Sequence, residues 1–556
     1  MTAFLYVQGD GTLLVQSDHP AYDAARATLL TFTELSQRLD PIHVYQMRPI
    51  TLWQAASLGA SARGILTFLR KHAAHPIPYA LQQLVVEEMS KWGKLSLQQG
   101  GNDRIVLRGD AGFLSIAKKM PGMKRLLLES QPEGLVFNSR HRADVKRLLA
   151  SNGYPVFDRV GYRVAPSIPF SWLQNTELRD YQSKAIQSFF DASREHSGVV
   201  VLPCGAGKTL VGIGILQQLQ MHALILTPNE TSAQQWRREF LERTDLTGEE
   251  VSMYAPDKPL TPITITTYQR VTAKTRKGER PHLTTLTSYP WGIVVYDEVH
   301  MLPAPLFRLA ADLQSARRLG LTATLVREDG AEADVFSLIG SKCYEVPWKQ
   351  LEQAGYLASV RCVEVRVALP PAQQAVYQQA QMREKHKIAS LNPAKVDVLK
   401  QILQQHTGEG VLILGHYLDL LTAIASDLNC PLLTGQTPQD ERLVWLNKFR
   451  SGEIRCLVLS RIANMAVDLP SASVAIQVSG LFGSRQEEAQ RLGRLLRPKT
   501  SQGVFYSLVS ENTVEERMSS HRQLYLVEQG YDYEIVASQE IAQERVIDRE
   551  AVGMPE

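Results

Sequence analysis

Two short motifs, each directly after an apolar run, hold the residue types that nucleotide hydrolysis needs. The first reads Pro203-Cys204-Gly205-Ala206-Gly207-Lys208-Thr209, and the second reads Asp297-Glu298-Val299-His300. Small residues let backbone N–H groups close around phosphates, a lysine balances their charge, and a threonine hydroxyl can bind Mg²⁺. An aspartate can hold that metal, and the glutamate after it can polarise an attacking water. The pair therefore predicts an enzyme that hydrolyses ATP with Mg²⁺.

The side chains of the two motifs suggest a role for each residue. We expect Glu298 to be catalytic, and Thr209 and Asp297 to bind the metal. The strict phosphate-loop pattern, G-x-x-x-x-G-K-[ST], would have glycine where this chain has Leu202, so the loop is a variant of that pattern. The loop residues expected to bind ATP are Gly205, Ala206, Gly207, Lys208 and Thr209.

A third segment, Leu178-Arg179-Asp180-Tyr181-Gln182, precedes the phosphate loop and opens a predicted helix. A glutamine amide can both donate to and accept from the edge of adenine, so we expect Arg179 and Gln182 to contact ATP. The alternative is that this segment only caps the N-terminus of a surface helix.

Two further segments carry groups that act on the nucleotide from a distance. The hydroxyls of Leu321-Thr322-Ala323-Thr324 can bond toward the acidic motif, so His300, Thr322 and Thr324 are expected to couple hydrolysis to movement. The alternative is that threonine is simply favoured in strands. Later in the chain, Arg494 and Arg497 would share one helix face and could act as arginine fingers on the γ-phosphate. Together with Gln490, they are expected to be catalytic. The alternative there is a solvated basic face.

Composition restricts the class of protein. The 556 residues predict roughly three or four domains, and a net charge of +3 confines any nucleic-acid contact to local patches. Five scattered cysteines without a C-x-x-C pair argue against a zinc ribbon, an iron–sulfur cluster and a disulfide framework. No stretch approaches the apolar length of a membrane span, and the N-terminus lacks the basic region of a secretory signal. We therefore expect a cytoplasmic protein that does not contact membranes.

Alternating strand-like and helix-like segments predict an α/β fold made of parallel sheets covered by helices. One series of apolar strands runs from Val199–Leu202 to Arg318–Thr322, and a second runs from Gly410–Leu414 to Gly503–Leu508. The expected parts are an α+β accessory region over 1–170, a first lobe over 171–345, a connector over 346–394, a second lobe over 395–535 and a polar tail over 536–556. We expect the tail to fray from Ser538 onward.

Taken in order, these motifs resemble those of superfamily 2 helicases, and more closely the XPB-type excision-repair helicases of prokaryotes. The resemblance covers residues 171–535 and is weaker over 1–170. It implies two tandem RecA-like lobes and an ATP-dependent 3′-to-5′ DNA helicase or translocase in nucleotide excision repair. The segments that carry it are Leu319–Asp329, Ser460–Pro470, Gln490–Lys499, Phe505–Val509 and Arg522–Tyr531.

The resemblance also implies roles for two segments outside the ATP motifs. The triplet Arg327-Glu328-Asp329 matches a family motif linked to duplex opening, although by themselves three such residues favour a solvated loop. A thumb-like insertion would fall within Pro370–Asn392, where Gln373–Ile388 reads as one helix.

A motor must step regardless of sequence, so its DNA contacts should go mainly to phosphates. We expect them at the carboxyl ends of strands. The segment from Lys118 to Arg147 contains eight basic and three acidic residues. This basic cluster could grip or probe DNA, or it could be a solvated face or a surface that docks a partner. The residues expected at strand ends are Thr227, Thr267, Arg270, Thr434, Gly435 and Arg461.

Three rival functions stay open. The protein could translocate on duplex DNA without processive unwinding, act on RNA, or serve as a nucleotide-dependent scaffold that recruits a nuclease or another repair protein. Stimulation of hydrolysis by different nucleic acids would separate the motors. A scaffold would keep its biological activity when Glu298→Gln blocks hydrolysis.

Overall fold

The structure is a computed structural model in which contacts divide the chain into two units. One unit comprises Met1–Leu202 and Gly207–Val346, and the other comprises Pro347–Glu556 together with Pro203–Ala206. The described residues are 3–39, 41–57, 59–101, 103–160, 165–190, 197–203, 205–275, 279–299, 313, 315–323, 335, 338–340, 342–460, 472–480, 503–531 and 533–541.

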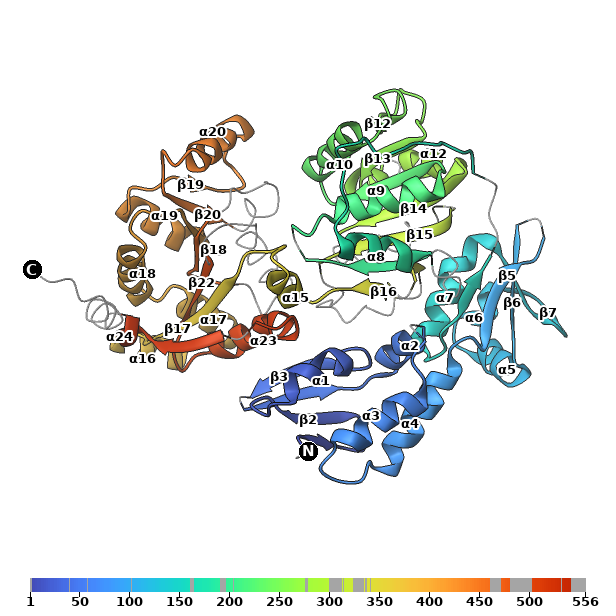
Figure 1. Ribbon diagram of the computed structural model, residues 1–556, viewed down its shortest axis with the longest axis horizontal. Helices are drawn as coiled ribbons and strands as arrows, with labels where there is room; N and C mark the ends of the chain where they lie inside the picture. The colour runs from blue at the N-terminus through green and yellow to red at the C-terminus, as the bar shows by residue number, and fades with distance from the viewer. Residues whose placement is uncertain are drawn as a thin grey trace, which may run out of the picture. The chain divides into compact units, whose positions relative to one another are not determined.

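Two small α+β modules precede the first lobe, which confirms the predicted class of the accessory region (Figure 1). The first has an antiparallel sheet in the order β1-β2-β4-β3, and the second has a sheet in the order β7-β8-β6-β5-β9. Their elements are β1 (Leu5–Val7), β2 (Thr12–Gln16), α1 (Tyr22–Leu29), β3 (Glu34–Leu39), β4 (Ile42–Gln46), α2 (Pro49–Ser57), α3 (Ala62–His72), α4 (Tyr79–Lys91), β5 (Leu95–Gln99), β6 (Arg104–Gly109), α5 (Ala111–Lys119), α6 (Met123–Leu126), β7 (Leu127–Gln131), β8 (Gly134–Asn138), η1 (Ser139–His141), α7 (Arg142–Ser151) and β9 (Phe157–Arg159).

The first lobe is a parallel sheet in the order β12-β13-β11-β14-β15-β10-β16, packed with helices (Figure 1). Four of its strands are buried along their whole length because helices cover both faces, and this explains their unbroken apolar sequences. The elements are α8 (Asp180–Phe189), β10 (Gly198–Val201), α9 (Lys208–Leu219), β11 (Ala223–Thr227), α10 (Glu230–Arg243), β12 (Val251–Met253), β13 (Ile263–Thr267), α11 (Tyr268–Thr272), α12 (Pro281–Ser288), β14 (Trp291–Asp297), β15 (Ser315–Thr322) and β16 (Lys342–Glu345).

The second lobe is also a parallel sheet, in the order β19-β20-β18-β21-β22-β17-β23. The predicted α/β class with two parallel-sheet lobes is therefore confirmed. The elements are α15 (Trp348–Gln353), β17 (Val360–Val367), α16 (Pro371–Gln379), α17 (Met382–Ser390), α18 (Ala394–Gln405), β18 (Val411–Gly415), α19 (Leu418–Asp427), β19 (Leu432–Leu433), α20 (Gln439–Arg450), β20 (Cys456–Ser460), β21 (Val474–Gln477), β22 (Gly503–Ser510), α23 (Val514–Glu528), β23 (Tyr533–Ala537) and α24 (Ser538–Ile541).

Two expectations for this part of the chain were wrong. The segment Gln373–Ile388 is not one helix, because Ala380 and Gln381 are extended and separate α16 from α17. Gln381 is the N-cap residue of α17, and its backbone N–H donates to the Glu384 carboxylate at 3.4 Å. Fraying does not begin at Ser538 either, since α24 packs on the lobe with Ile541 only 2% exposed.

No helix within the described ranges combines the length and apolar character that crossing a bilayer requires.

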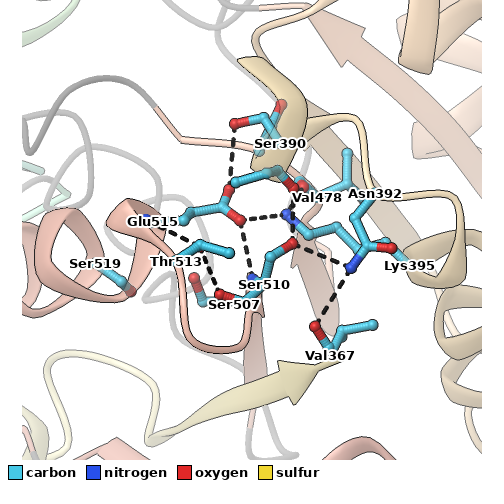
Figure 2. A network of polar contacts seen from close by, with 12 residues as sticks. Val367, Ser390, Asn392, Lys395, Val478, Ser507, Ser510, Thr513, Glu515 and Ser519 are labelled. Carbon is cyan, nitrogen blue, oxygen red and sulfur yellow. Dashed lines mark hydrogen bonds and ion pairs between the residues drawn. The ribbon is translucent and has the colours of Figure 1, made fainter. Parts of the chain in front are cut away.

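A buried ion pair joins α18, α23, the end of β22 and the segment that follows β21 (Figure 2). Lys395 of α18 lies 2.7 Å from Glu515 of α23, and the side chains are 0% and 1% exposed. The Lys395 ammonium also donates to the Val478 carbonyl at 3.1 Å, and Glu515 accepts the Ser510 backbone N–H at 2.9 Å. Burial lowers the pKa of Lys395, which its bond to Glu515 opposes. Because each charge satisfies the other and a backbone group, neither can be removed alone without leaving a buried charge.

We expect Glu515→Gln to lower the free energy of unfolding of the second lobe by about 3–5 kcal/mol, since Lys395 then stays buried without a counter-charge. The matched control is Asp427→Asn, which removes an ion pair of similar length, 2.6 Å, between side chains that are 43% and 42% exposed. Urea unfolding followed by hydrogen exchange of β22 amides measures both variants. Equal stability of the two would show that burial adds nothing to the Lys395–Glu515 pair.

Candidate nucleotide site and nucleic-acid edge

The strand order of the first lobe places the two motifs one strand apart. Strand β10 ends at the phosphate loop, β14 ends at Asp297, and both are hydrogen-bonded to β15. Val201 is in register with Thr322, and Asp297 is in register with Leu321. Because all three strands are parallel, their carboxyl ends meet at one edge of the sheet, where ligands bind in open α/β folds.

Glycine is needed at two positions of the phosphate loop. Gly205 and Gly207 have φ angles of +80° and +76°, a region that other residues adopt with strain. A Cβ on Gly207 would also lie 2.4 Å from Nε2 of Gln182, whereas one on Gly205 would meet nothing within 4 Å. Helix α9 begins directly afterwards at Lys208, and the first N–H groups of a helix are available to an anion.

Gln182 serves the fold in a way that the alternative sequence interpretation anticipated. Its Oε1 accepts the backbone N–H of Arg179 at 2.9 Å, so the side chain caps the N-terminus of α8. The amide is 3% exposed, and its nitrogen packs against Gly207 of the phosphate loop. The glutamine thus positions the loop through its side chain. Contact of Arg179 or Gln182 with adenine stays a prediction.

Lys208 and Glu298 meet although they come from different motifs. The ammonium lies 2.9 Å from Oε1 of the carboxylate, and the two side chains are 11% and 20% exposed. Glu298 itself has φ of +48°, which is strained for a residue with a Cβ and occurs most often at functional sites. The structure therefore brings the residue expected to balance phosphate charge into contact with the residue expected to polarise water.

Asp297 is held by three hydrogen bonds, and two of the donors, Trp236 and Tyr268, are residues for which the sequence predicted no role in this site. Trp236 of α10 donates its indole N–H to Oδ2 at 3.0 Å, and the Glu298 backbone N–H donates to Oδ1 at 3.1 Å. Tyr268 donates its hydroxyl to the Asp297 carbonyl at 2.7 Å. Burial and the Glu298 carboxylate raise the pKa of Asp297 to about 6, while the bonds from Trp236 and the charge of Lys208 oppose that rise.

The residues at this edge fit a magnesium ion. Mg²⁺ prefers oxygen ligands and is usually held by one or two carboxylates together with substrate phosphates. The Asp297 carboxylate supplies such a ligand, and Thr209 in the first turn of α9 supplies a hydroxyl. Within the described part of the chain, no cluster of three or more His, Cys, Asp or Glu side chains could hold a metal by itself.

Thr322 lies at the end of β15, where its carbonyl accepts the Leu202 N–H at 3.0 Å. This contact joins the strand of the expected coupling residues to the start of the phosphate loop. The other expected residues lie outside the described ranges, so their roles stay predictions: His300, Thr324, Arg327, Glu328, Asp329, Arg461, Gln490, Arg494 and Arg497.

The expected DNA contacts of the first lobe follow β11 and β13. Thr227 is 0% exposed, and its hydroxyl is within bonding distance of two backbone carbonyls, at 3.1 and 3.3 Å. Thr267 caps α11 by accepting the Arg270 N–H at 3.3 Å. Arg270 is exposed and lies 3.5 Å from Glu230. Of the three, Arg270 alone presents a charged group to solvent.

In the second lobe, Thr434 and Gly435 follow β19 in a turn that leads into α20. The Thr434 N–H donates to the Thr437 hydroxyl at 2.9 Å, and the Thr434 hydroxyl accepts the Gln436 N–H at 3.1 Å. Arg442 donates to the Thr434 carbonyl at 3.2 Å. Gly435 is exposed at the centre of this turn, so its backbone is accessible to a phosphate.

The basic cluster of the accessory region is smaller than its sequence indicates. Arg142 and Lys146 both pair with Asp158, at 2.8 Å each, and their side chains are 13% and 6% exposed. Burial lowers the pKa of Lys146 to about 8 despite the Asp158 charge. These two cations stabilise the module and do not contribute to a DNA-binding surface.

Three family models match the chain. A model described as the ERCC3/RAD25/XPB C-terminal helicase matches residues 351–551. A model described as the res subunit of type III restriction enzymes matches residues 175–327, and one described as a helicase conserved C-terminal domain matches residues 5–131.

Curated relatives align along nearly the whole chain. The "DNA 3′-5′ helicase XPB" of Kineococcus radiotolerans is 44% identical over 97% of this chain and 97% of its own. The protein of the same name from Mycobacterium tuberculosis is 43% identical over 95% of this chain and 97% of its own. The "general transcription and DNA repair factor IIH helicase/translocase subunit XPB" of Schizosaccharomyces pombe is 29% identical over 95% of this chain and 75% of its own.

Among solved structures, Saccharomyces cerevisiae Dbp5 bound to RNA and ADP BeF3 aligns with 68% of this chain and 95% of its own, at 14% identity and a TM-score of 0.47.

We expect Gly207→Ala to impair nucleotide binding more than Gly205→Ala. Both substitutions place a Cβ at a positive φ, but only the one at 207 collides with Gln182. Titration with a fluorescent ATP analogue gives the affinity of each variant. Equal loss in the two variants would show that φ strain alone matters and that the Gln182 contact does not.

Proposed function

Because the chain belongs to the XPB family of superfamily 2 DNA helicases, we propose that it couples ATP hydrolysis to 3′-to-5′ movement on DNA and opens the duplex in nucleotide excision repair. The observation that carries this proposal is the contact of Lys208 with Glu298 beside Asp297, in a chain that aligns end to end with two bacterial DNA 3′-5′ helicases.

Hydrolysis would take place at the carboxyl edge of the first lobe. Lys208 would bind the terminal phosphates, and Thr209 and Asp297 would hold Mg²⁺, which neutralises phosphate charge when bound. Glu298 would orient and deprotonate the attacking water. Since Lys208 contacts Glu298 at 2.9 Å, a bound phosphate would compete for the ammonium and release the carboxylate for that role.

The remaining roles are proposed from the sequence. Arg494 and Arg497, with Gln490, would stabilise charge on the transferred phosphate. Thr322, Thr324 and His300 would relay the state of the site. DNA phosphates would lie along the strand ends of both lobes, at Arg270, Gly435 and the other positions expected there.

We also propose the division into an accessory region over 1–170, lobes over 171–345 and 395–535, a connector over 346–394 and a tail over 536–556. A cytoplasmic location and a nuclease or other repair protein as partner complete the proposal.

A translocase that distorts duplex DNA without processive unwinding is the second candidate. The name of the Schizosaccharomyces pombe relative, "helicase/translocase subunit XPB", supports this candidate because it joins both activities. Both candidates use the same ATP site and differ in whether strands separate.

The function predicts ATP hydrolysis that rises when DNA is added. Single-stranded DNA, duplex DNA and RNA are compared as stimulators, and displacement of a strand is measured on duplexes with either a 3′ or a 5′ tail. We expect stimulation by DNA and displacement from the 3′ tail only. Stimulation by duplex without displacement identifies a translocase, and stimulation by RNA alone contradicts the proposal.

Two variants complete this experiment. Lys208→Ala should lose nucleotide binding and hydrolysis. Glu298→Gln should bind ATP but hydrolyse it far more slowly, because it lacks the group that accepts the proton of the water. If Glu298→Gln supports repair in cells as well as the unaltered protein does, the protein is a scaffold and not a motor.

The triplet Arg327-Glu328-Asp329 should separate two activities that site variants lose together. Replacing all three by alanine should leave DNA-stimulated hydrolysis within a few-fold, because no role in phosphate or metal binding is proposed for them. Displacement of the 3′-tailed strand should fall sharply. A parallel fall of both activities would place the triplet in the hydrolytic machinery, and no fall in either would make it a solvated loop.

A further inference from the structure

The carboxylate of Asp297 is bonded on both oxygens by donors from the protein. The indole N–H of Trp236 lies 3.0 Å from Oδ2, and the Glu298 N–H lies 3.1 Å from Oδ1. Each carboxylate oxygen can accept two hydrogen bonds, so each has a second lone pair that can bind a cation or a water molecule of its hydration shell. The donors therefore restrict the rotation of the carboxylate without using up its capacity to bind a metal.

The position of the indole is built into the packing of the lobe. Trp236 is 1% exposed, although it belongs to α10, a helix made mostly of polar residues. A Cβ on Gly212 of α9 would lie 2.3 Å from the indole, and that helix carries Lys208 and Thr209 at its N-terminus. The absence of a side chain at Gly212 lets the ring pass between the helix and the sheet to reach Asp297. The indole thus spans from the helix of the phosphate loop to the acidic motif.

The backbone of Asp297 is held as well as its side chain. Tyr268 is 6% exposed and donates its hydroxyl to the Asp297 carbonyl at 2.7 Å. With the carbonyl fixed by Tyr268, the indole bond determines the remaining freedom, which is rotation about the side-chain bonds.

A second buried tryptophan of the first lobe, Trp291, donates its indole N–H to a backbone carbonyl and not to Asp297. Trp291 is also 1% exposed, and it donates its N–H to the Leu286 carbonyl at 2.8 Å. The two tryptophans match in size and burial, and each has a bonded N–H. They differ in that only Trp236 donates to a carboxylate.

We propose that Trp236 is the positioning residue of the magnesium ligand Asp297, and that its indole reports metal binding. The inference rests on the proposed metal role of Asp297. Donors that orient a metal-binding side chain typically contribute about 10–100-fold to metal affinity. A cation bound to the carboxylate also draws electron density from the oxygen that accepts the indole N–H, so the fluorescence of Trp236 should change on binding.

The test compares Trp236→Phe with Trp291→Phe, using Mg²⁺ and ADP as probes. Each change removes an indole of the same burial. We expect Trp236→Phe to raise, by about tenfold or more, the Mg²⁺ concentration that half-saturates the ADP complex of the protein. The affinity for ADP in the absence of Mg²⁺ should stay unchanged. Trp291→Phe should leave the half-saturation unchanged. Equal Mg²⁺ dependence of the two variants would overturn the positioning role.

Intrinsic fluorescence provides a readout that does not depend on turnover. Mg²⁺ added to the ADP complex should change the emission of the unaltered protein and of Trp291→Phe, and should change neither Trp236→Phe nor Asp297→Asn. A change that persists in Trp236→Phe would overturn the reporter role. If Trp236→Phe does not fold, Gly212→Ala takes its place, because it keeps Trp236 in the chain but displaces the indole from Asp297. An unchanged Mg²⁺ dependence in Gly212→Ala would then overturn the positioning role.

Two outcomes with Asp297→Asn distinguish this inference from the proposed function. If that variant loses Mg²⁺ dependence while Trp236→Phe behaves as Trp291→Phe, the metal role stands and the positioning role fails. If Asp297→Asn keeps the Mg²⁺ half-saturation of the unaltered protein, the metal role itself is wrong. Gly212→Ala gives a further check, since it should displace the indole and weaken Mg²⁺ binding while retaining Trp236.

Discussion

The hydrogen-bonded register of β10, β15 and β14 is the constraint on which the site depends. Val201 pairs with Thr322, and Asp297 pairs with Leu321, so three strands end at the same level. The phosphate loop and the acidic motif leave the sheet from the two outer strands of this triplet. A slip of one residue would turn each side chain to the other face of the sheet and separate Lys208 from Glu298. Because β10 and β14 are buried along their whole length, apolar packing on both faces resists such a slip.

At the carboxyl edge of the first-lobe sheet, neighbouring protein groups contact the charged side chains of the site. Lys208 contacts Glu298, while Asp297 is bonded to an indole and to a backbone N–H. The second lobe also contains an ion pair, but there Lys395 and Glu515 are fully buried and also bind backbone groups. At the first edge the charged groups stay partly exposed and can exchange partners with a ligand. In the second lobe the pair is closed off and serves the fold.

The sequence predicted the parts of the structure that are encoded locally. Apolar strands followed by small or acidic residues gave the α/β class and the candidate strands of both lobes. The contact of Trp236 with Asp297 joins residues 61 positions apart and depends on the space left by Gly212, so no local pattern could show it. A tryptophan inside a polar helix was its single visible signal. The sequence also placed Arg142 and Lys146 in a basic surface cluster, although both are paired in the structure. Their partner Asp158 lies outside the segment from Lys118 to Arg147 that defined the cluster.

The strand order of the second lobe has a consequence for how the chain folds during synthesis. Strand β17 comes first in the lobe, yet both of its neighbours come last, since Val360 pairs with Gly503 and Cys362 pairs with Tyr533. Until β22 and β23 have left the ribosome, β17 has two unpaired edges and its buried side chains have no partner strands. Contacts between residues so far apart form slowly, and exposed strand edges favour association with other chains. A nascent or prematurely terminated chain would therefore present an adhesive strand that the finished protein conceals at the interior of its sheet.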